Sequence, residues 1–202
     1  MKIYTEDELA EILEKHRLWL GGDDGGERAD LRSADLSYID LSYIDLSRAD
    51  LRDANLSSAN LSDANLSDAN LRCADLRSAD LRSANLSDAD LSDADLRSAN
   101  LRSADLRCAN LRDPILWGTT GNMGEIKSIA LDTYAIAYTD TYLQIGCERH
   151  EIGEWWAFDD ERIDQMDKGA LEWWKKWKPF IQQAIEMSPA TPTKREDKEE
   201  AA

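Results

Sequence analysis

Cys147 and His150 are the residues whose types and spacing come closest to a reactive site in this chain. A C-x-x-H arrangement could supply a nucleophilic thiol and a general base, provided that the two side chains lie within hydrogen-bond reach. A zinc site needs about four ligands, and the only other histidine, His16, lies near the N-terminus. We therefore assign no catalytic residue, metal or cofactor, and keep an enzyme or ligand site around Cys147 and His150 as an alternative.

The remaining composition narrows the classes of function. The sequence contains no P-loop, dinucleotide-binding, zinc-protease or serine-hydrolase motif. Its three cysteines cannot all pair, which favours a reducing cytoplasm. A net charge of −17 repels phosphate backbones and anionic lipid, and there is no signal peptide or membrane-spanning run. We therefore expect neither direct nucleic-acid binding nor membrane binding.

The central part of the chain is a repeat. Leucine stands at every fifth position from Leu31 to Leu111, 17 times in all. The residue two places before each leucine is alanine except at Ile39 and Ile44, and the residue directly before it is always Asp or Asn. Five is the period of neither a helix nor a flat strand. Self-similarity of this regularity indicates a solenoid.

The A-(D/N)-L-x-x pattern resembles the pentapeptide repeat family over about 90 of the 202 residues. The resemblance implies a right-handed quadrilateral β-helix of about four coils, with four pentapeptides per square coil and with Ala and Leu pointing inward. The geometry is consistent, because one small and one large inward residue per side lets stacked coils interdigitate. Asp and Asn suit the corners, since both bond their own backbone in tight turns.

We predict a mainly β protein in four segments. An N-terminal helical cap and Gly-rich joint occupy residues 1–26, and the repeat column occupies 27–116. A small C-terminal α+β domain follows at 117–187. The tail at 188–202 is rich in charge, Pro and Thr, and is predicted to be disordered.

The N-terminal cap is expected to be a helix over residues 5–20, which starts at a capping box of Thr5 and Glu8. It would cover the open ladder at the end of the column. The following "GGDDGG" is expected to be a flexible joint. Tyr38 and Tyr43 of the first coil should point outward, where we expect them to pack against the cap; a contact patch is the alternative.

Beyond the repeat, Pro114 takes an alanine slot and is predicted to end the ladder. Residues 125–146 are β-branched and aromatic, which favours two or three short strands. Two short helices are predicted at 151–158 and 159–167, and a longer amphipathic helix at 169–187.

Five of the seven tryptophans lie between residues 155 and 177. A tryptophan stripe at helical spacing is most often core, and the alternative is a partner surface that includes Trp173 and Trp177. Self-association into a homodimer through this helix is a further hypothesis. The region resembles the C-terminal part of many phage and prophage pentapeptide-repeat proteins, at Gln144, Ile145, Gly146, Cys147, His150, Trp155, Met166 and Trp174.

If residues 20 apart stack, one face of the column carries interleaved acids and arginines: Asp30, Arg32, Asp50, Arg52, Asp53, Arg72, Asp90 and Asp93. Such neighbours can simply solubilise the face and pair weakly. Proteins that resemble the gyrase-protecting group of the family are usually proposed to present a rod shaped and charged like duplex DNA. The short rod and its many arginines depart from that pattern.

We predict a non-enzymatic protein-binding module of phage or prophage origin. Its acidic rigid surface would bind and block a bacterial host protein, such as a nucleic-acid-handling or defence enzyme. The surface would comprise the acid–arginine face with Tyr38, Tyr43, Trp173 and Trp177. A rigid surface loses little entropy on binding, and acidic charge favours basic clefts.

Overall fold

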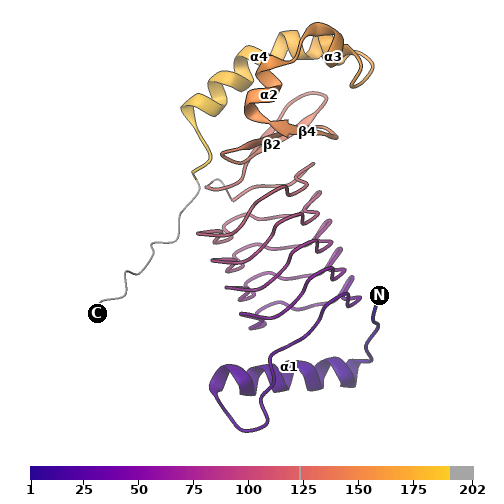
Figure 1. Ribbon diagram of the computed structural model, residues 1–202, viewed down its shortest axis with the longest axis vertical. Helices are drawn as coiled ribbons and strands as arrows, with labels where there is room; N and C mark the ends of the chain where they lie inside the picture. Colours follow the sequence, from indigo (N-terminus) through magenta and orange to yellow (C-terminus); the bar gives the residue numbers. More distant parts are fainter. Residues whose placement is uncertain (123, 192–202) are drawn as a thin grey trace, which may run out of the picture.

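The computed structural model describes residues 1–122 and 124–191. The molecule is elongated, with a helix across one end, a column of stacked coils in the middle and a small α+β unit at the other end (Figure 1). The predicted disorder of residues 192–202 lies outside the described residues.

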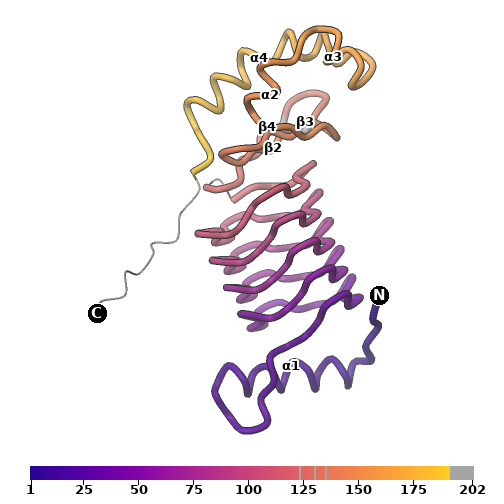
Figure 2. Tube along the Cα trace, viewed as in Figure 1, coloured from indigo at the N-terminus to yellow at the C-terminus, as the bar shows by residue number. Residues whose placement is uncertain are grey.

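The column is built from coils of 20 residues. Parallel bridges link residues 20 apart, and one line of them joins Asp30, Asp50, Asn70, Asp90 and Asn110. A 20-residue coil holds four repeats, so each coil has four sides of five residues, and the coils lie above one another along the axis (Figure 2). The predicted stacking of residues 20 apart is confirmed.

The four sides of the column are named here by their segments in the first coil. Side 1 starts with residues 29–33, side 2 with 34–38, side 3 with 39–43 and side 4 with 44–48, and each side recurs every 20 residues. The predicted acid–arginine face is side 1.

Three N–H groups of each repeat form the ladder between coils. On side 1, Leu31 and Ser33 donate to the carbonyls of Asp50 and Arg52 in the next coil, at 2.8 and 2.9 Å. The N–H of Asp50 donates back to the carbonyl of Ala29 at 3.0 Å. The next coil therefore supplies one donor and two acceptors to each side below it.

The other two N–H groups are satisfied within the same coil. Each alanine N–H closes a turn on the carbonyl of the preceding leucine, as from Ala34 to Leu31 at 3.2 Å. The N–H that follows each leucine donates to the Asp or Asn side chain two residues earlier, as from Ser57 to Asn55 at 3.1 Å. Buried backbone groups need such partners, which explains why Asp or Asn precedes every leucine.

The second residue after each leucine adopts a left-handed backbone. This holds for 17 non-glycine residues from Ser33 to Asp113, with φ between 54° and 62°. Most of these positions carry Ser or Asp. Tyr38 (φ 59°) and Tyr43 (φ 60°) place bulky aromatic residues there, which is unusual because the left-handed region is strained for a side chain of this size.

Leucine and alanine fill the inside of the column. Each repeat leucine from Leu31 to Leu106 is at most 5% exposed. Leu111, in the last coil, is only partly buried. Ile39 and Ile44, which replace alanine in the first coil, are partly buried and pack against this core.

Helix α1 (Glu6–Gly21) covers the N-terminal end of the column. The predicted capping box is confirmed, since Thr5 Oγ1 accepts from the N–H of Glu8 at 3.2 Å and Glu8 Oε2 accepts from the N–H of Thr5 at 2.9 Å. Leu9 and His16 are its buried residues. The segment before α1 joins the ladder at one point, because Lys2 forms a parallel bridge with Ala34.

The Gly-rich segment after α1 is a turn held against the helix, contrary to the predicted flexible joint. The N–H of Glu27 donates to the carbonyl of Lys15 at 3.0 Å. Gly26 lies so close to the helix that an added Cβ would stand 2.3 Å from the nitrogen of Trp19. Glycine is therefore required for the close approach of two backbones, and the turn fixes the cap on the column.

The predicted end of the ladder at Pro114 is wrong. Ile115 pairs with Asp95 and Thr120 pairs with Asn100, so the coils continue to residue 120. Pro114 occupies an alanine slot, whose N–H closes a turn onto the preceding leucine in the same coil rather than bonding to another coil. Its missing N–H therefore leaves the ladder intact.

The C-terminal unit consists of a four-stranded antiparallel sheet and three helices. The strands are adjacent in sequence order: β1 (Lys127–Ala130), β2 (Ala135–Tyr138), β3 (Tyr142–Ile145) and β4 (Glu148–Glu151). The helices are α2 (Ile152–Ala157), α3 (Asp160–Asp164) and α4 (Ala170–Met187). Three strands lie where two or three were predicted, and β4 follows beyond that segment.

The first residues of the predicted disordered tail are packed. Ala190 is 7% exposed and belongs to the core of the C-terminal unit. Tyr138 Oη donates to the carbonyl of Ser188 at 2.8 Å, and the N–H of Thr191 donates to the carbonyl of Gly124 at 3.2 Å. Residues 188–191 thus return the chain to the junction between the column and the C-terminal unit.

Candidate interaction surfaces

Cys147 and His150 are not brought together. Cys147 is exposed in the turn between β3 and β4, whereas His150 lies on β4 and packs edge-on against Trp155 and Phe158. The Nε2 atom of His150 lies 3.2 Å from Glu148 Oε2. No hydrogen bond joins the thiol to the imidazole in the described part of the chain, so the geometry of a Cys–His catalytic pair is missing.

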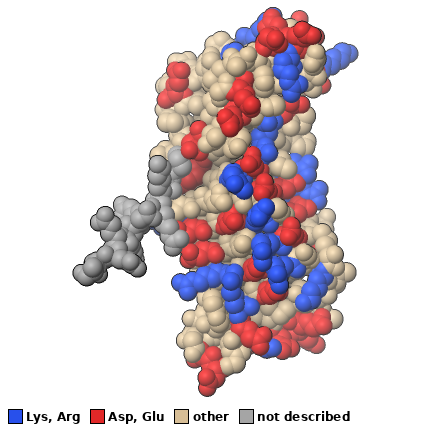
Figure 3. All heavy atoms as spheres, in the orientation of Figure 1, with Lys and Arg blue, Asp and Glu red and all other residues tan. Residues whose placement is uncertain are grey.

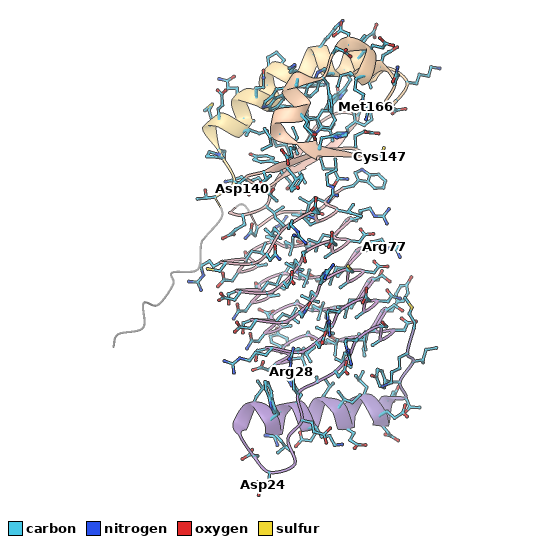
Figure 4. The ribbon with its side chains drawn as sticks, in the orientation of Figure 1. Asp24, Arg28, Arg77, Asp140, Cys147 and Met166 are labelled. Atoms are coloured by element: carbon cyan, nitrogen blue, oxygen red, sulfur yellow. The ribbon has the colours of Figure 1, made fainter. Side chains whose placement is uncertain are left out.

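The thiol of Cys147 borders a small apolar hollow of about 50 Å³, whose lining includes Tyr134, Met166 and Trp173. Figure 4 places Cys147 and Met166 on the same side of the C-terminal unit. Tyr134 Oη donates to Asp167 Oδ2 at 2.6 Å, and this bond raises the pKa of Tyr134 to about 12. The hollow is smaller than ordinary ligand sites.

The residues predicted for side 1 lie on one face of the column, but neighbouring groups of opposite charge compensate their charges. Arg32 donates to both carboxylate oxygens of Asp30, at 2.7 and 2.6 Å, and this bond lowers the pKa of Asp30 to about 2. Arg52 binds Asp50 in the same bidentate manner. The cross-coil contact from Arg32 to Asp50, at 3.8 Å, extends the network.

The upper part of side 1 follows the same principle. Arg72 Nε lies 3.6 Å from Asp93. Asp90 accepts from the hydroxyl of Ser92 at 2.6 Å and from the amide of Asn110 at 3.0 Å. Figure 3 shows basic and acidic residues interspersed on the visible face of the column. Side 1 is therefore a patterned surface of local pairs, and its Asp53 adds one further exposed carboxylate.

Tyr38 and Tyr43 form the most exposed aromatic surface of the column. Their side chains are 81% and 78% exposed, and neither belongs to the hydrophobic core. The expectation that they pack against α1 is therefore wrong. Left-handed backbone directs the residue outward at the edge of a coil, so the first coil presents these two rings on neighbouring sides 2 and 3.

Arginines lie further along the same two sides. Tyr43 borders a groove of about 320 Å³ that also contains Arg82 and Arg102. Arg82 is bonded to Asp80 of its own repeat at 2.6 Å. Arg102 follows Asn100 instead of an aspartate, so it lacks this bidentate partner. The aromatic surface and a cation thus share one groove on side 3.

The two predicted surface tryptophans are tied to the C-terminal unit. Trp173 is 9% exposed, so it presents little area to a partner, and the expectation of a contact surface there is not met. The indole N–H groups of Trp173 and Trp177 donate to Asp132 Oδ1 at 2.9 and 3.1 Å. Lys176 donates to the other oxygen, and these bonds lower the pKa of Asp132. Trp177 remains partly exposed.

No cluster of three or more His, Cys, Asp or Glu side chains could hold a metal ion within the described ranges. Within the same ranges, no helix has both the length and the apolar character needed to cross a membrane.

Comparison with known proteins identifies the family. The family model of pentapeptide repeats, in 8 copies, matches residues 29–68, 59–97 and 79–118. A pentapeptide repeat protein from Nostoc PCC 7120 of solved structure is 36% identical, and the match covers 55% of this chain and 93% of that chain, with a TM-score of 0.25. The chain belongs to the pentapeptide repeat family. The resemblance inferred from the A-(D/N)-L-x-x pattern is confirmed.

Two further pentapeptide repeat proteins of solved structure are similar. HetL from the cyanobacterium Nostoc sp. strain PCC 7120, involved in heterocyst differentiation regulation, is 44% identical over 47% of this chain and 46% of that chain, with a TM-score of 0.46. Rfr23 from the cyanobacterium Cyanothece 51142 is 39% identical over 46% and 61%, with a TM-score of 0.43. This chain thus spans about half the length of HetL and less than two thirds of Rfr23. The comparison with curated proteins gives no match.

The family model matches the column and ends at residue 118. The phage or prophage origin of the C-terminal unit therefore stays a prediction.

Proposed function

We propose that this pentapeptide repeat protein is a non-enzymatic protein-binding module that presents Tyr38 and Tyr43 to a bacterial host protein. The proposal rests on two properties of these tyrosines, their exposed rings and their strained backbone. A left-handed backbone costs a residue with a side chain roughly 1–2 kcal/mol, and most equivalent slots carry Ser or Asp. Because neither ring is buried within the chain, the benefit of a tyrosine at these positions comes from a partner.

The surroundings of the two rings suit a protein contact. Tyrosine and arginine are enriched among residues that dominate binding energy at interfaces, and Tyr43 shares its groove with Arg82 and Arg102. The ladder fixes the backbone on which the rings stand, so little conformational entropy is lost on binding. The contact centre proposed here lies on sides 2 and 3, with side 1 as a flanking surface.

The charge of the molecule sets the class of partner. A net charge of −17 favours encounter with a basic protein surface. We propose that the module originates from a phage or prophage and blocks such a surface on a nucleic-acid-handling or defence enzyme. Raising the salt concentration should then slow association, because the steering field is screened over about 10 Å at 0.1 M salt.

Affinity capture from nuclease-treated bacterial lysate tests the proposal. The baits are the full chain, the double variant Tyr38→Ser with Tyr43→Ser, and a matched control with Asp68→Ser and Asp88→Ser in the same backbone slot on side 4. Serine already occupies the same backbone slot at Ser58 and Ser83, so the fold is retained. The proposal expects one host protein on the full chain and on the control, and its loss from the tyrosine variant. Equal capture by all three baits would contradict it.

A further inference from the structure

At the C-terminal end of the column, sides 1 and 2 differ in how their ladders end. On side 2, the ladder groups of the last coil are taken over by side chains of the sheet. The N–H of Leu116 donates to Gln144 Oε1 at 2.6 Å, and the carbonyl of Pro114 accepts from Arg149 at 2.9 Å. Gln144 is 2% exposed, so this cap is built into the junction.

Side 1 of the last coil, residues 109–113, has no such cap. In every lower coil, the leucine and the second residue after it donate to the coil above, as Leu91 and Asp93 do to Asn110 and Arg112. Within the described ranges, nothing accepts from the N–H groups of Leu111 and Asp113. The inward residues here are also only partly buried, although their equivalents in lower coils are fully buried.

The uncovered edge forms one wall of a groove of about 310 Å³. Ala109, Leu111 and Arg112 line the column wall, and Glu125 with Asp140 to Tyr142 lines the opposite wall. Figure 4 places Asp140 at this junction, on the side away from Cys147. The groove is thus separate from the Cys147 hollow, and it lies at the opposite end of the column from Tyr38 and Tyr43.

We infer that this groove binds an extended segment of a partner protein, which adds to side 1 as the next strand of the ladder. The column itself specifies the occupant. What stacks on side 1 in lower coils is a strand with a small residue two places before a leucine, as at Ala49 and Leu51. Such a strand supplies the missing acceptors and covers Ala109 and Leu111, in the manner of β-strand addition.

The chain's own C-terminal segment fits this groove less well. Thr191, the last described residue, is bonded to Gly124, beside the groove-lining Glu125. The sequence of residues 192–202, "PTKREDKEEAA", contains no large aliphatic residue that could cover Leu111. We therefore assign the groove to a partner, and the tail is the competing occupant in the test.

The test is an NMR titration of the full chain with a peptide of residues 47–53, "SRADLRD", in which the amide signals of Leu111 and Asp113 are followed. In the column, the N–H of Asp50 points to the coil below, whereas that of Leu51 points to the coil above. N-methylation at Asp50 should therefore abolish binding, and N-methylation at Leu51 is the matched control that should retain it. Replacing Leu51 of the peptide by serine should weaken binding at least about tenfold.

Three outcomes would overturn the inference. The first is equal binding of the two methylated peptides, and the second is shifts that avoid Leu111 and Asp113. The third is binding only to a chain that ends at residue 191, because the tail would then be the occupant. The peptide variants leave the protein unchanged, so loss of folding cannot imitate the first two results.

Discussion

Replacing Tyr38 and Tyr43 together by asparagine should stabilise the fold while it removes the proposed contact. Both residues hold a left-handed backbone, at φ 59° and 60°, and asparagine adopts this region several-fold more readily than residues with larger side chains. The rings are 81% and 78% exposed, so little burial is lost. From a strain of roughly 1–2 kcal/mol per residue, we expect a gain of about 0.5 kcal/mol at each site.

Thermal and urea denaturation followed by circular dichroism measures this gain. For a chain of this size, about 1 kcal/mol raises Tm by roughly 2–4 °C. The matched control is Asp63→Asn with Asp68→Asn, which occupy the same backbone slot on sides 3 and 4 and already suit it. The control should leave Tm nearly unchanged. A tyrosine variant that is destabilised would refute the reasoning, because the rings would then be held by contacts within the chain.

Three further predictions concern the column and its caps. Leu71→Ala should lower the free energy of unfolding by roughly 3–5 kcal/mol, because Leu71 is 0% exposed and the ladder prevents collapse of the cavity. Leu111→Ala should lower it by less than half as much, because Leu111 is only partly buried. Equal shifts of the urea midpoint in the two variants would contradict this view of the core. Gln144→Leu should destabilise the junction by roughly 1–3 kcal/mol, since it leaves the N–H of Leu116 without its partner, and hydrogen exchange at that amide should rise; unchanged exchange would contradict the cap. Burial lowers the pKa of His16, against the opposing effects of the Ser47 backbone and Asp45, and its Nε2 has no hydrogen-bond partner in the described part of the chain. The neutral form of His16 is therefore favoured in the folded state, so the stability it contributes is present above the unfolded pKa of about 6.5 and is lost as pH falls through the lower folded pKa. His16→Gln should flatten that part of the plot of urea midpoint against pH. An unaltered plot would assign the pH dependence to another group.

Much of the column could be predicted from the sequence because its pattern is enforced by hydrogen bonding at every repeat. The leucine period gave the stacking of residues 20 apart, and the Asp or Asn before each leucine indicated a side chain that bonds its own backbone. The N-terminal cap followed from Thr5 and Glu8, whose reciprocal bonds are local. These features depend on neighbouring residues or on strict repetition, so one chain carries enough information for them.

Three features were predicted wrongly or not at all because they depend on how the chain folds rather than on the local sequence. Pro114 was expected to stop the ladder because proline lacks an N–H, but which N–H enters the ladder depends on the turn inside each repeat. The left-handed position was missed because Ser, Asp and Tyr occupy it instead of glycine. The joint at Gly26 looked flexible in sequence, although its glycine serves a close approach to Trp19 that only the fold reveals.

The candidate site was predictable only in part. The residues of side 1 share one face of the column, as their spacing predicts. The ion pair between Arg32 and Asp30, however, depends on local geometry that a count of charges does not reveal. Trp173 was assigned to a surface because helical spacing alone cannot say which neighbours cover it. The outward direction of Tyr38 and Tyr43 was predictable from their slots, but the prediction that they pack against the helical cap is wrong, and the structure adds that both hold a left-handed backbone.

Site-specific photo-crosslinking tests the central claim most directly. A photoreactive phenylalanine analogue replaces Tyr38 or Tyr43 in the full chain, and Asp68 or Asp88 on side 4 in matched controls, before exposure to bacterial lysate. The proposed function predicts one crosslinked host protein shared by positions 38 and 43 and absent, or much weaker, at 68 and 88. Equal crosslinking at all four positions, or none at 38 and 43, would contradict a binding surface centred on the two tyrosines.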